Sequence, residues 1–77
     1  MKKTNITKAR RLFNEGVTIY LMPSKVAFAN PWISPIRINN VENENTFDSI
    51  VNAYRYYNLG NGYLGGVAYW YDDGRNQ

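Results

Sequence analysis

Residues 45–58 read NTFDSIVNAYRYYN and give the clearest helix signal in the chain. Their apolar and aromatic side chains recur at i, i+3, i+4, i+7 and i+10, which is the spacing of one helix face. These side chains belong to Phe47, Ile50, Val51, Tyr54 and Tyr57. Asn45 is a good helix cap, with Asp48 three residues further on as an imperfect capping box, and Gly60 ends the helix. The stretch therefore predicts an amphipathic helix with one face in the core.

A second amphipathic helix is predicted near the start of the chain, over residues 4–15. Four apolar residues fall on one stripe of this helix: Ile6, Ala9, Leu12 and Phe13. Thr4 or Asn5 can cap its start, because their side-chain oxygens accept hydrogen bonds from exposed backbone N–H groups. Gly16 follows the helix and can adopt the left-handed conformation that ends many helices.

Three segments show the alternation that is typical of β-strands: residues 17–22, 36–38 and 67–71. Pro23 ends the first strand because proline cannot donate to a sheet ladder. Pro35 indicates that the second strand is an edge strand or has just begun.

The last of these strands divides its side chains between the two faces of the sheet. Val67, Tyr69 and Tyr71 are predicted on one face, and Ala68 and Trp70 on the other. Residues 25–30, by contrast, fit either a short strand or a loop.

The predicted order of elements, α-β-β-α-β, indicates an α+β fold. We expect a small, three-stranded, mainly antiparallel sheet with two helices packed on one face, which leaves the other face open or in contact with a partner. The 77 residues form one small domain, 1–77, with residues 1–3 and 72–77 loose. The expected core consists of Leu12, Phe13, Ile19, Leu21, Ile50, Val51 and Tyr54.

The chain contains no histidine and no cysteine, but it is rich in aromatic residues. Seven of its twelve aromatic residues lie between positions 54 and 71. The usual nucleophile–base pairs and zinc ligands are therefore missing, whereas tyrosine and tryptophan suit binding. The two carboxylate pairs, Asp72 with Asp73 and Glu42 with Glu44, show none of the opposed environments that an acid–base pair needs. We expect a protein that is not an enzyme and that binds no cofactor or metal.

The net charge of +3 is unevenly distributed, since five of the nine cationic residues lie within the first eleven positions. This cluster is either a phosphate-binding arm or a solvated helix face that aids solubility. Arg10 and Arg11 are the better candidates for anion contacts, because guanidinium groups bind anions more specifically than ammonium groups do. No apolar run suits a membrane helix or a signal peptide, so we expect a cytoplasmic protein with no membrane partner.

Two glycine-rich patterns near the C-terminus have simple structural explanations. Residues 60–65 spell GxGxxG, but they follow a helix and precede a strand, which is the reverse of a dinucleotide site. Residues 62–69 are similar to the RNA-contact strand of RNA-recognition motifs, although Gly66 stands where the central aromatic residue is needed. The first pattern is better explained as a helix stop followed by a turn. In the second, Tyr69 and Tyr71 are better explained as covering the core or a partner.

Residues 9–24, 30–32 and 47–58 together resemble small uncharacterised accessory proteins carried by phages and conjugative elements of Gram-positive bacteria. The resemblance spans positions 9 to 71 and carries over no catalytic residue. It implies a mobile-element context, in which small proteins of this kind often act by binding a host protein, such as a defence nuclease or transcription machinery.

The leading prediction is therefore a small non-catalytic protein-binding module of phage or mobile-element type, acting as an inhibitor of a host effector such as a defence nuclease. The alternative is a nucleic-acid-binding module that uses the basic first helix and the C-terminal tyrosines. The expected partner is a host or phage protein, with nucleic acid as the alternative and self-association as a further option. Trp32 either fills the core or forms a binding hot spot. The candidate contact residues are Arg10, Arg11, Trp32, Tyr56, Tyr63, Tyr69, Trp70 and Tyr71.

Overall fold

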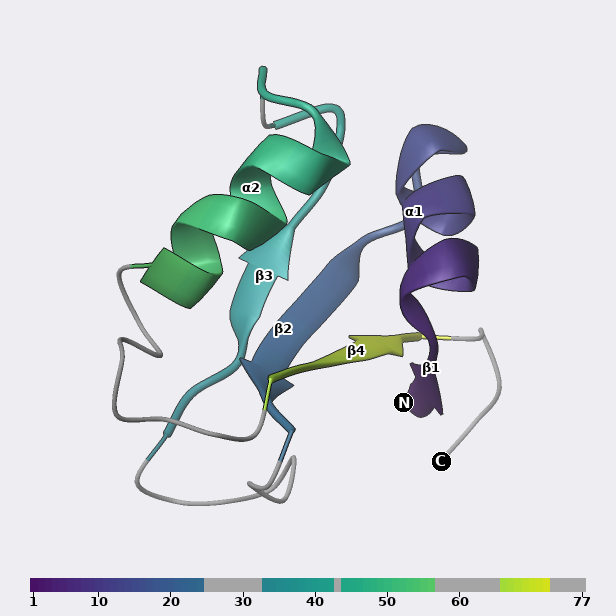
Figure 1. The fold of residues 1–77 in the computed structure, drawn as a ribbon. Helices are drawn as coiled ribbons and strands as arrows, with labels where there is room; N and C mark the ends of the chain where they lie inside the picture. Colours follow the sequence, from purple (N-terminus) through teal and green to yellow (C-terminus); the bar gives the residue numbers. More distant parts are fainter. Residues whose placement is uncertain (25–32, 43, 57–65, 73–77) are drawn as a thin grey trace.

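The computed structural model describes residues 1–24, 33–42, 44–56 and 66–72 (Figure 1). Two helices and four strands follow one another in the order β-α-β-β-α-β. Their bounds are β1 (Lys2–Thr4), α1 (Ile6–Asn14), β2 (Ile19–Pro23), β3 (Ile36–Ile38), α2 (Phe47–Tyr54) and β4 (Val67–Tyr71). The predicted α+β class is confirmed, but the sheet has four strands where three were expected.

Helix α1 begins and ends as its sequence predicts. The side chain of Asn5 accepts a hydrogen bond from the Lys8 backbone N–H at 2.8 Å, which satisfies one of the open donors of the first turn. At the other end, Gly16 has φ +92°, a conformation that glycine adopts without the steric penalty of a side chain.

Helix α2 begins one residue later than predicted, because its cap is Thr46 and not Asn45. Thr46 is the cap, and its hydroxyl accepts a hydrogen bond from the Ser49 backbone N–H at 3.2 Å. This start makes Phe47 the first helical residue and buries its ring, which gives the physical reason for the shift. The helix ends at Tyr54, and the predicted continuation through Asn58 to Gly60 lies outside the described residues.

The four strands lie in the order β1-β4-β2-β3, and every neighbouring pair is antiparallel. Because β1 and β2 are both antiparallel to β4, they are parallel to each other, with β4 between them. By the same argument β3 is parallel to β4, with β2 between them. Helix α1 connects β1 to β2, and helix α2 connects β3 to β4, so each helix joins two parallel strands. One strand of the other pair lies between the two strands of each pair, so the fold consists of two interleaved split β-α-β units.

Strand β1 is the element that the sequence did not predict. Lys2 pairs with Tyr71 and Lys3 pairs with Trp70, so residues that we expected in a loose N-terminus form an edge of the sheet. Thr4, which we expected at the start of the first helix, ends this strand. Its three residues, Lys-Lys-Thr, have no apolar alternation to mark a strand. Their pairing depends on β4, which lies at the other end of the chain.

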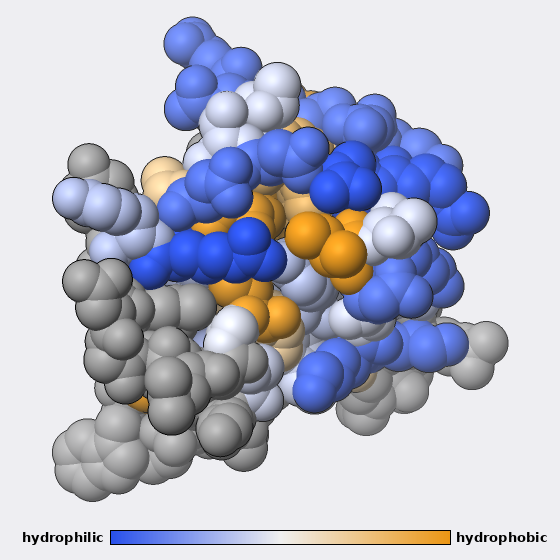
Figure 2. All heavy atoms as spheres, in the orientation of Figure 1, coloured by the Kyte–Doolittle hydropathy of each residue, from blue (hydrophilic) through white to orange (hydrophobic). Residues whose placement is uncertain are grey.

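The core lies between the helices and one face of the sheet. The Phe47 ring is at its centre, 5.5 Å from the Phe13 ring and 6.0 Å from the Tyr69 ring, measured between centroids. The buried cluster consists of Ala9, Phe13, Ile19, Leu21, Ile38, Phe47, Val51, Tyr54, Tyr69 and Tyr71. Of the predicted core, Leu12 and Ile50 are only partly buried and pack against this cluster. Figure 2 shows apolar side chains in the seam between α1 and α2, bordered by hydrophilic side chains.

Neither of the two described helices has the length and apolar character that crossing a membrane requires.

Candidate functional site

The alternation of β4 places neighbouring aromatic residues in opposite environments. Tyr69 and Tyr71 point towards the helices and belong to the core, with 5% and 8% of their surfaces exposed. Trp70 points to the other face of the sheet and is half-buried. The predicted division of this strand between two faces is confirmed, and Trp70 is the β4 aromatic residue on the face away from the helices.

On the face away from the helices, four side chains form one row across all four strands. Lys3 of β1 pairs with Trp70 of β4, Trp70 pairs with Tyr20 of β2, and Tyr20 pairs with Arg37 of β3. We call Lys3, Trp70, Tyr20 and Arg37 the open-face row. It has two aromatic rings on the central strands and one cation at each end, and the Lys3 ammonium lies 6.0 Å from the centroid of the Trp70 ring.

The next pair along this face is different, because it is closed to solvent. Met22 and Ala68 pair on the same face and are 0% and 4% exposed, although neither belongs to the core cluster beneath the helices. In the open-face row, by contrast, Tyr20 and Trp70 are half-buried and Lys3 and Arg37 are exposed. The row is therefore the accessible part of these two central strands.

The predicted contact arginines are held in ion pairs on the surface. Arg10 forms an ion pair with Asp48 at 2.9 Å, which connects α1 to α2, and Arg11 lies 3.8 Å from Glu15 on the same helix. Exposed pairs of this kind stabilise a protein by about 0–1 kcal/mol and remain accessible to solvent. Neither arginine lies in the open-face row, because both are on α1, which covers the other face of the sheet.

The lysines of the N-terminal region differ from Arg10 and Arg11 in their ion pairing. Among the described residues, Lys2, Lys3 and Lys8 have no carboxylate within ion-pair distance. Lys8 donates a hydrogen bond to the Tyr71 hydroxyl at 3.2 Å, and its ammonium lies 5.2 Å from the centroid of that ring. Among the described residues of the N-terminal region, the cations without an ion pair are therefore Lys2 and Lys3 at the β1 edge and Lys8 on α1, and not Arg10 and Arg11.

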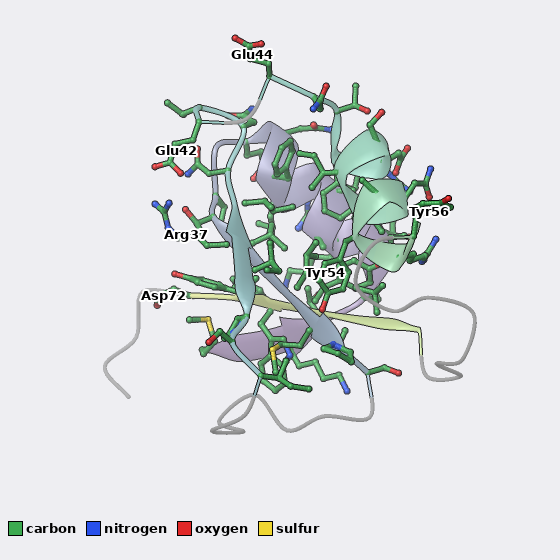
Figure 3. The ribbon with its side chains drawn as sticks, turned by 90° about the vertical axis from the view of Figure 1, so that its left-hand side faces the viewer. Arg37, Glu42, Glu44, Tyr54, Tyr56 and Asp72 are labelled. Atoms are coloured by element: carbon green, nitrogen blue, oxygen red, sulfur yellow. The ribbon has the colours of Figure 1, made fainter. Side chains whose placement is uncertain are left out.

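The other predicted contact residues are separated from the row. Tyr56 is 76% exposed, but it follows α2 and lies on the opposite side of the molecule from Arg37 (Figure 3). Trp32 and Tyr63 lie outside the described residues. The structure therefore brings one predicted aromatic residue, Trp70, into the row.

Two residues of the row, Tyr20 and Arg37, were missed as contact residues in the sequence, and Lys3 was considered only as part of the basic N-terminal cluster. Tyr20 alternates with Ile19 and Leu21, so the sequence contained the signal that it faces away from the core. The alignment of Lys3 and Arg37 with the two aromatic rings had no such signal, because it depends on which strands are neighbours and in what register.

Among the described residues, two titratable groups have clearly shifted pKa values, those of Tyr69 and Arg37. Burial raises the pKa of the Tyr69 phenol, and the nearby Arg55 guanidinium opposes that effect, so the phenol stays protonated at neutral pH. A hydrogen bond and the charge of Glu42 raise the pKa of Arg37. In the described ranges, no three potential metal ligands come together.

The chain matches no protein-family model, no curated protein and no solved structure.

Proposed function

We propose that this chain is a small non-catalytic protein-binding module and that its contact surface is the open-face row. The observation that carries the proposal is the row itself: a lysine, a tryptophan, a tyrosine and an arginine in register across four strands, on the face away from both helices. Tryptophan, tyrosine and arginine are the residue types that contribute most to protein interfaces.

The charge of the row favours a protein over nucleic acid. Arg37 is balanced by Glu42 through a 2.5 Å contact, which leaves Lys3 as the unbalanced cation of the row. Affinity for nucleic acid comes largely from the neutralisation of several phosphates. An interface with two aromatic anchors and few net charges fits a protein partner better.

A nucleic-acid-binding module is the second candidate, and one observation favours it. Trp70 and Tyr20 form a pair on the two central strands of a four-stranded sheet, and bases of single-stranded RNA stack on aromatic residues in such a position. Lys2 and Lys3 at the sheet edge can contact phosphates. This version uses the N-terminal lysines, because the tyrosines of β4 belong to the core.

The kind of partner follows from the resemblance to accessory proteins of phages and conjugative elements. Within our proposal, the partner is a protein of the Gram-positive host, such as a defence nuclease, and binding inhibits it.

Capture from host lysate with chemical cross-linking tests the proposal. We expect the unchanged chain to retain a protein partner, and the double variant Tyr20→Ala with Trp70→Ala to lose it. Tyr56→Ala is the matched control, because it removes an exposed tyrosine away from the row. Circular dichroism of each variant checks that it is folded.

The same capture is repeated after nuclease treatment and at two salt concentrations. A protein partner should survive both changes. If binding disappears with the nuclease, and if single-stranded nucleic acid binds with a steep dependence on salt, the second candidate replaces the first.

A further inference from the structure

The two edges of the sheet differ in how well they are protected. Strand β1 carries two exposed lysines, Lys2 and Lys3, whose charges no described carboxylate balances. Charged side chains, lysine above all, discourage another strand from pairing with an edge. Strand β3 carries a single charge, Arg37, and Glu42 already balances it. In the part of the chain that the structure describes, the β3 edge therefore lacks the charge protection that the β1 edge has.

Exposed apolar side chains occur within and on either side of β3 in the sequence. Among the described residues, four large hydrophobic side chains are exposed, and three of them lie in or beside β3: Ile33 at 37%, Ile36 at 41% and Val41 at 82%. Ile36 pairs with the fully buried Leu21 of β2, so it continues the surface of the core to the outer edge of the sheet. A strand added there would extend this surface and cover Ile36.

We propose that β3 is a docking edge, at which an extended segment of a partner protein adds a fifth strand to the sheet. This inference rests on the proposed protein-binding function and specifies its partner. The incoming strand has an acidic residue opposite Arg37 and apolar residues at the positions on either side. Backbone hydrogen bonds supply affinity in this mode of binding, and the alternating side chains supply specificity.

Charge complementarity selects a foreign strand over a second copy of the chain. In a two-fold antiparallel pairing centred on β3, Arg37 lies opposite Arg37 of the second copy. Pairing β3 with β1 brings Arg37 against Lys2 or Lys3, and pairing two β1 strands brings lysine against lysine. Like charges directly opposite each other destabilise a sheet, an effect that Glu42 offsets only in part at Arg37, whereas a carboxylate opposite Arg37 stabilises the pairing.

The existing ion pair leaves room for this carboxylate. Glu42 contacts Arg37 through Nη1, and a guanidinium group has five N–H donors in all. Arg37 also ends the open-face row, beside Tyr20. A partner on β3 is therefore in a position to reach the aromatic side chains of the row as well.

Selection from a displayed library of random twelve-residue peptides tests the inference, with the folded full-length chain as bait. We expect the enriched peptides to alternate apolar residues around a central aspartate or glutamate. Arg37→Glu should weaken these peptides about ten-fold or more, and a selection against that variant should enrich lysine or arginine in their place. Glu42→Gln should strengthen the acidic peptides about three-fold, because it removes the competing carboxylate.

Lys2→Glu is the matched control, since it makes the same charge change at the other edge of the sheet and should leave peptide binding unchanged. Amide signals of Ile36, Arg37 and Ile38 should shift in nuclear magnetic resonance spectra when a selected peptide is added. The inference is overturned if no peptide is enriched, if the enriched peptides lack the acidic residue, or if Arg37→Glu binds them equally well. Lysate capture that still depends on Tyr20 and Trp70 would then leave the proposed function standing without a docking edge.

Discussion

Tyr69 and Trp70 are neighbours in the chain, but they lie on opposite faces of the same sheet. Tyr69 packs beneath the helices against Phe47, whereas Trp70 lies in a single row of side chains on the other face. The inner face has a second layer that buries it, and along the open-face row no described helix covers the rings. The comparison shows that neighbours in a run of similar aromatic residues can lie in different environments: alternate residues are buried beneath the helices, and Trp70 between them lies half-buried on the other face.

The largest expected difference between the two faces is in stability. Phe47→Ala should lower the free energy of unfolding by about 3–5 kcal/mol, because it opens a cavity between the rings of Phe13 and Tyr69. A loss of this size is a large share of the stability of a small domain. Urea denaturation followed by circular dichroism measures it.

Trp70→Ala removes a larger side chain but should cost only about 1–2 kcal/mol, because the indole is half-buried and pairs across the sheet with Lys3 and Tyr20. The same urea titration compares the two variants. If Trp70→Ala destabilises the protein as much as Phe47→Ala does, the face away from the helices is a second core and not a contact surface.

Removing a single hydroxyl oxygen compares two tyrosines of the inner face, Tyr69 and Tyr71. Within the described residues, the buried Tyr69 hydroxyl makes no hydrogen bond of good geometry, although the Arg55 guanidinium lies nearby, so Tyr69→Phe should raise the free energy of unfolding by up to about 1 kcal/mol. Tyr71→Phe is the control, because its hydroxyl accepts the hydrogen bond from Lys8, and its removal should lower stability by about 0.5–1 kcal/mol. Equal effects of the two variants would contradict this view of the Tyr69 hydroxyl.

The Tyr69 phenol also predicts a dependence on alkaline pH. Burial raises its pKa in the folded state above the ordinary value of 10.0, so the unfolded chain loses this proton first. The contribution of Tyr69 to stability is therefore complete below pH 10 and is lost as the pH rises through the folded-state pKa. Thermal melts between pH 8 and pH 11 should show a smaller decline for Tyr69→Phe than for the unchanged chain.

The smallest effects are expected at the surface arginines. Arg10→Ala should cost up to about 1 kcal/mol because its ion pair connects the two helices, and Arg11→Ala about 0.3–0.5 kcal/mol because its pair lies within one helix. Both losses should shrink in high salt. A loss of partner binding in either variant, with the fold intact, would move the contact surface from the sheet to α1.

Local signals in the sequence were sufficient for most of the elements. The Asn5 cap, Gly16 and the apolar stripe of α1 act within a few residues of one another, and so do the alternating residues of β2 and β4. The pairing of strands depends on contacts between distant segments, which is why β1 was missed. Pro35 did indicate an edge position, and β3 is indeed an edge strand.

The candidate site was harder to predict than the fold. Trp70 was among the predicted contact residues, but its partners come from three other strands and cannot be known without the register. Arg10 was chosen for its chemistry, and the structure pairs it with Asp48, which lies on a different helix. The role of the row, and the mobile-element origin suggested by the resemblance, stay predictions.

The position of β4 between β1 and β2 has a consequence for the order of events during synthesis. A chain that emerges from the ribosome can form the β2–β3 hairpin early, but β1 has no neighbour until β4 follows, because Lys2 pairs with Tyr71. Until then, Ile19 and Leu21 lack the tyrosines that pair with them. We therefore expect a nascent chain stalled before Val67 to remain sensitive to protease, and resistance to arise in a single step once β4 has left the exit tunnel.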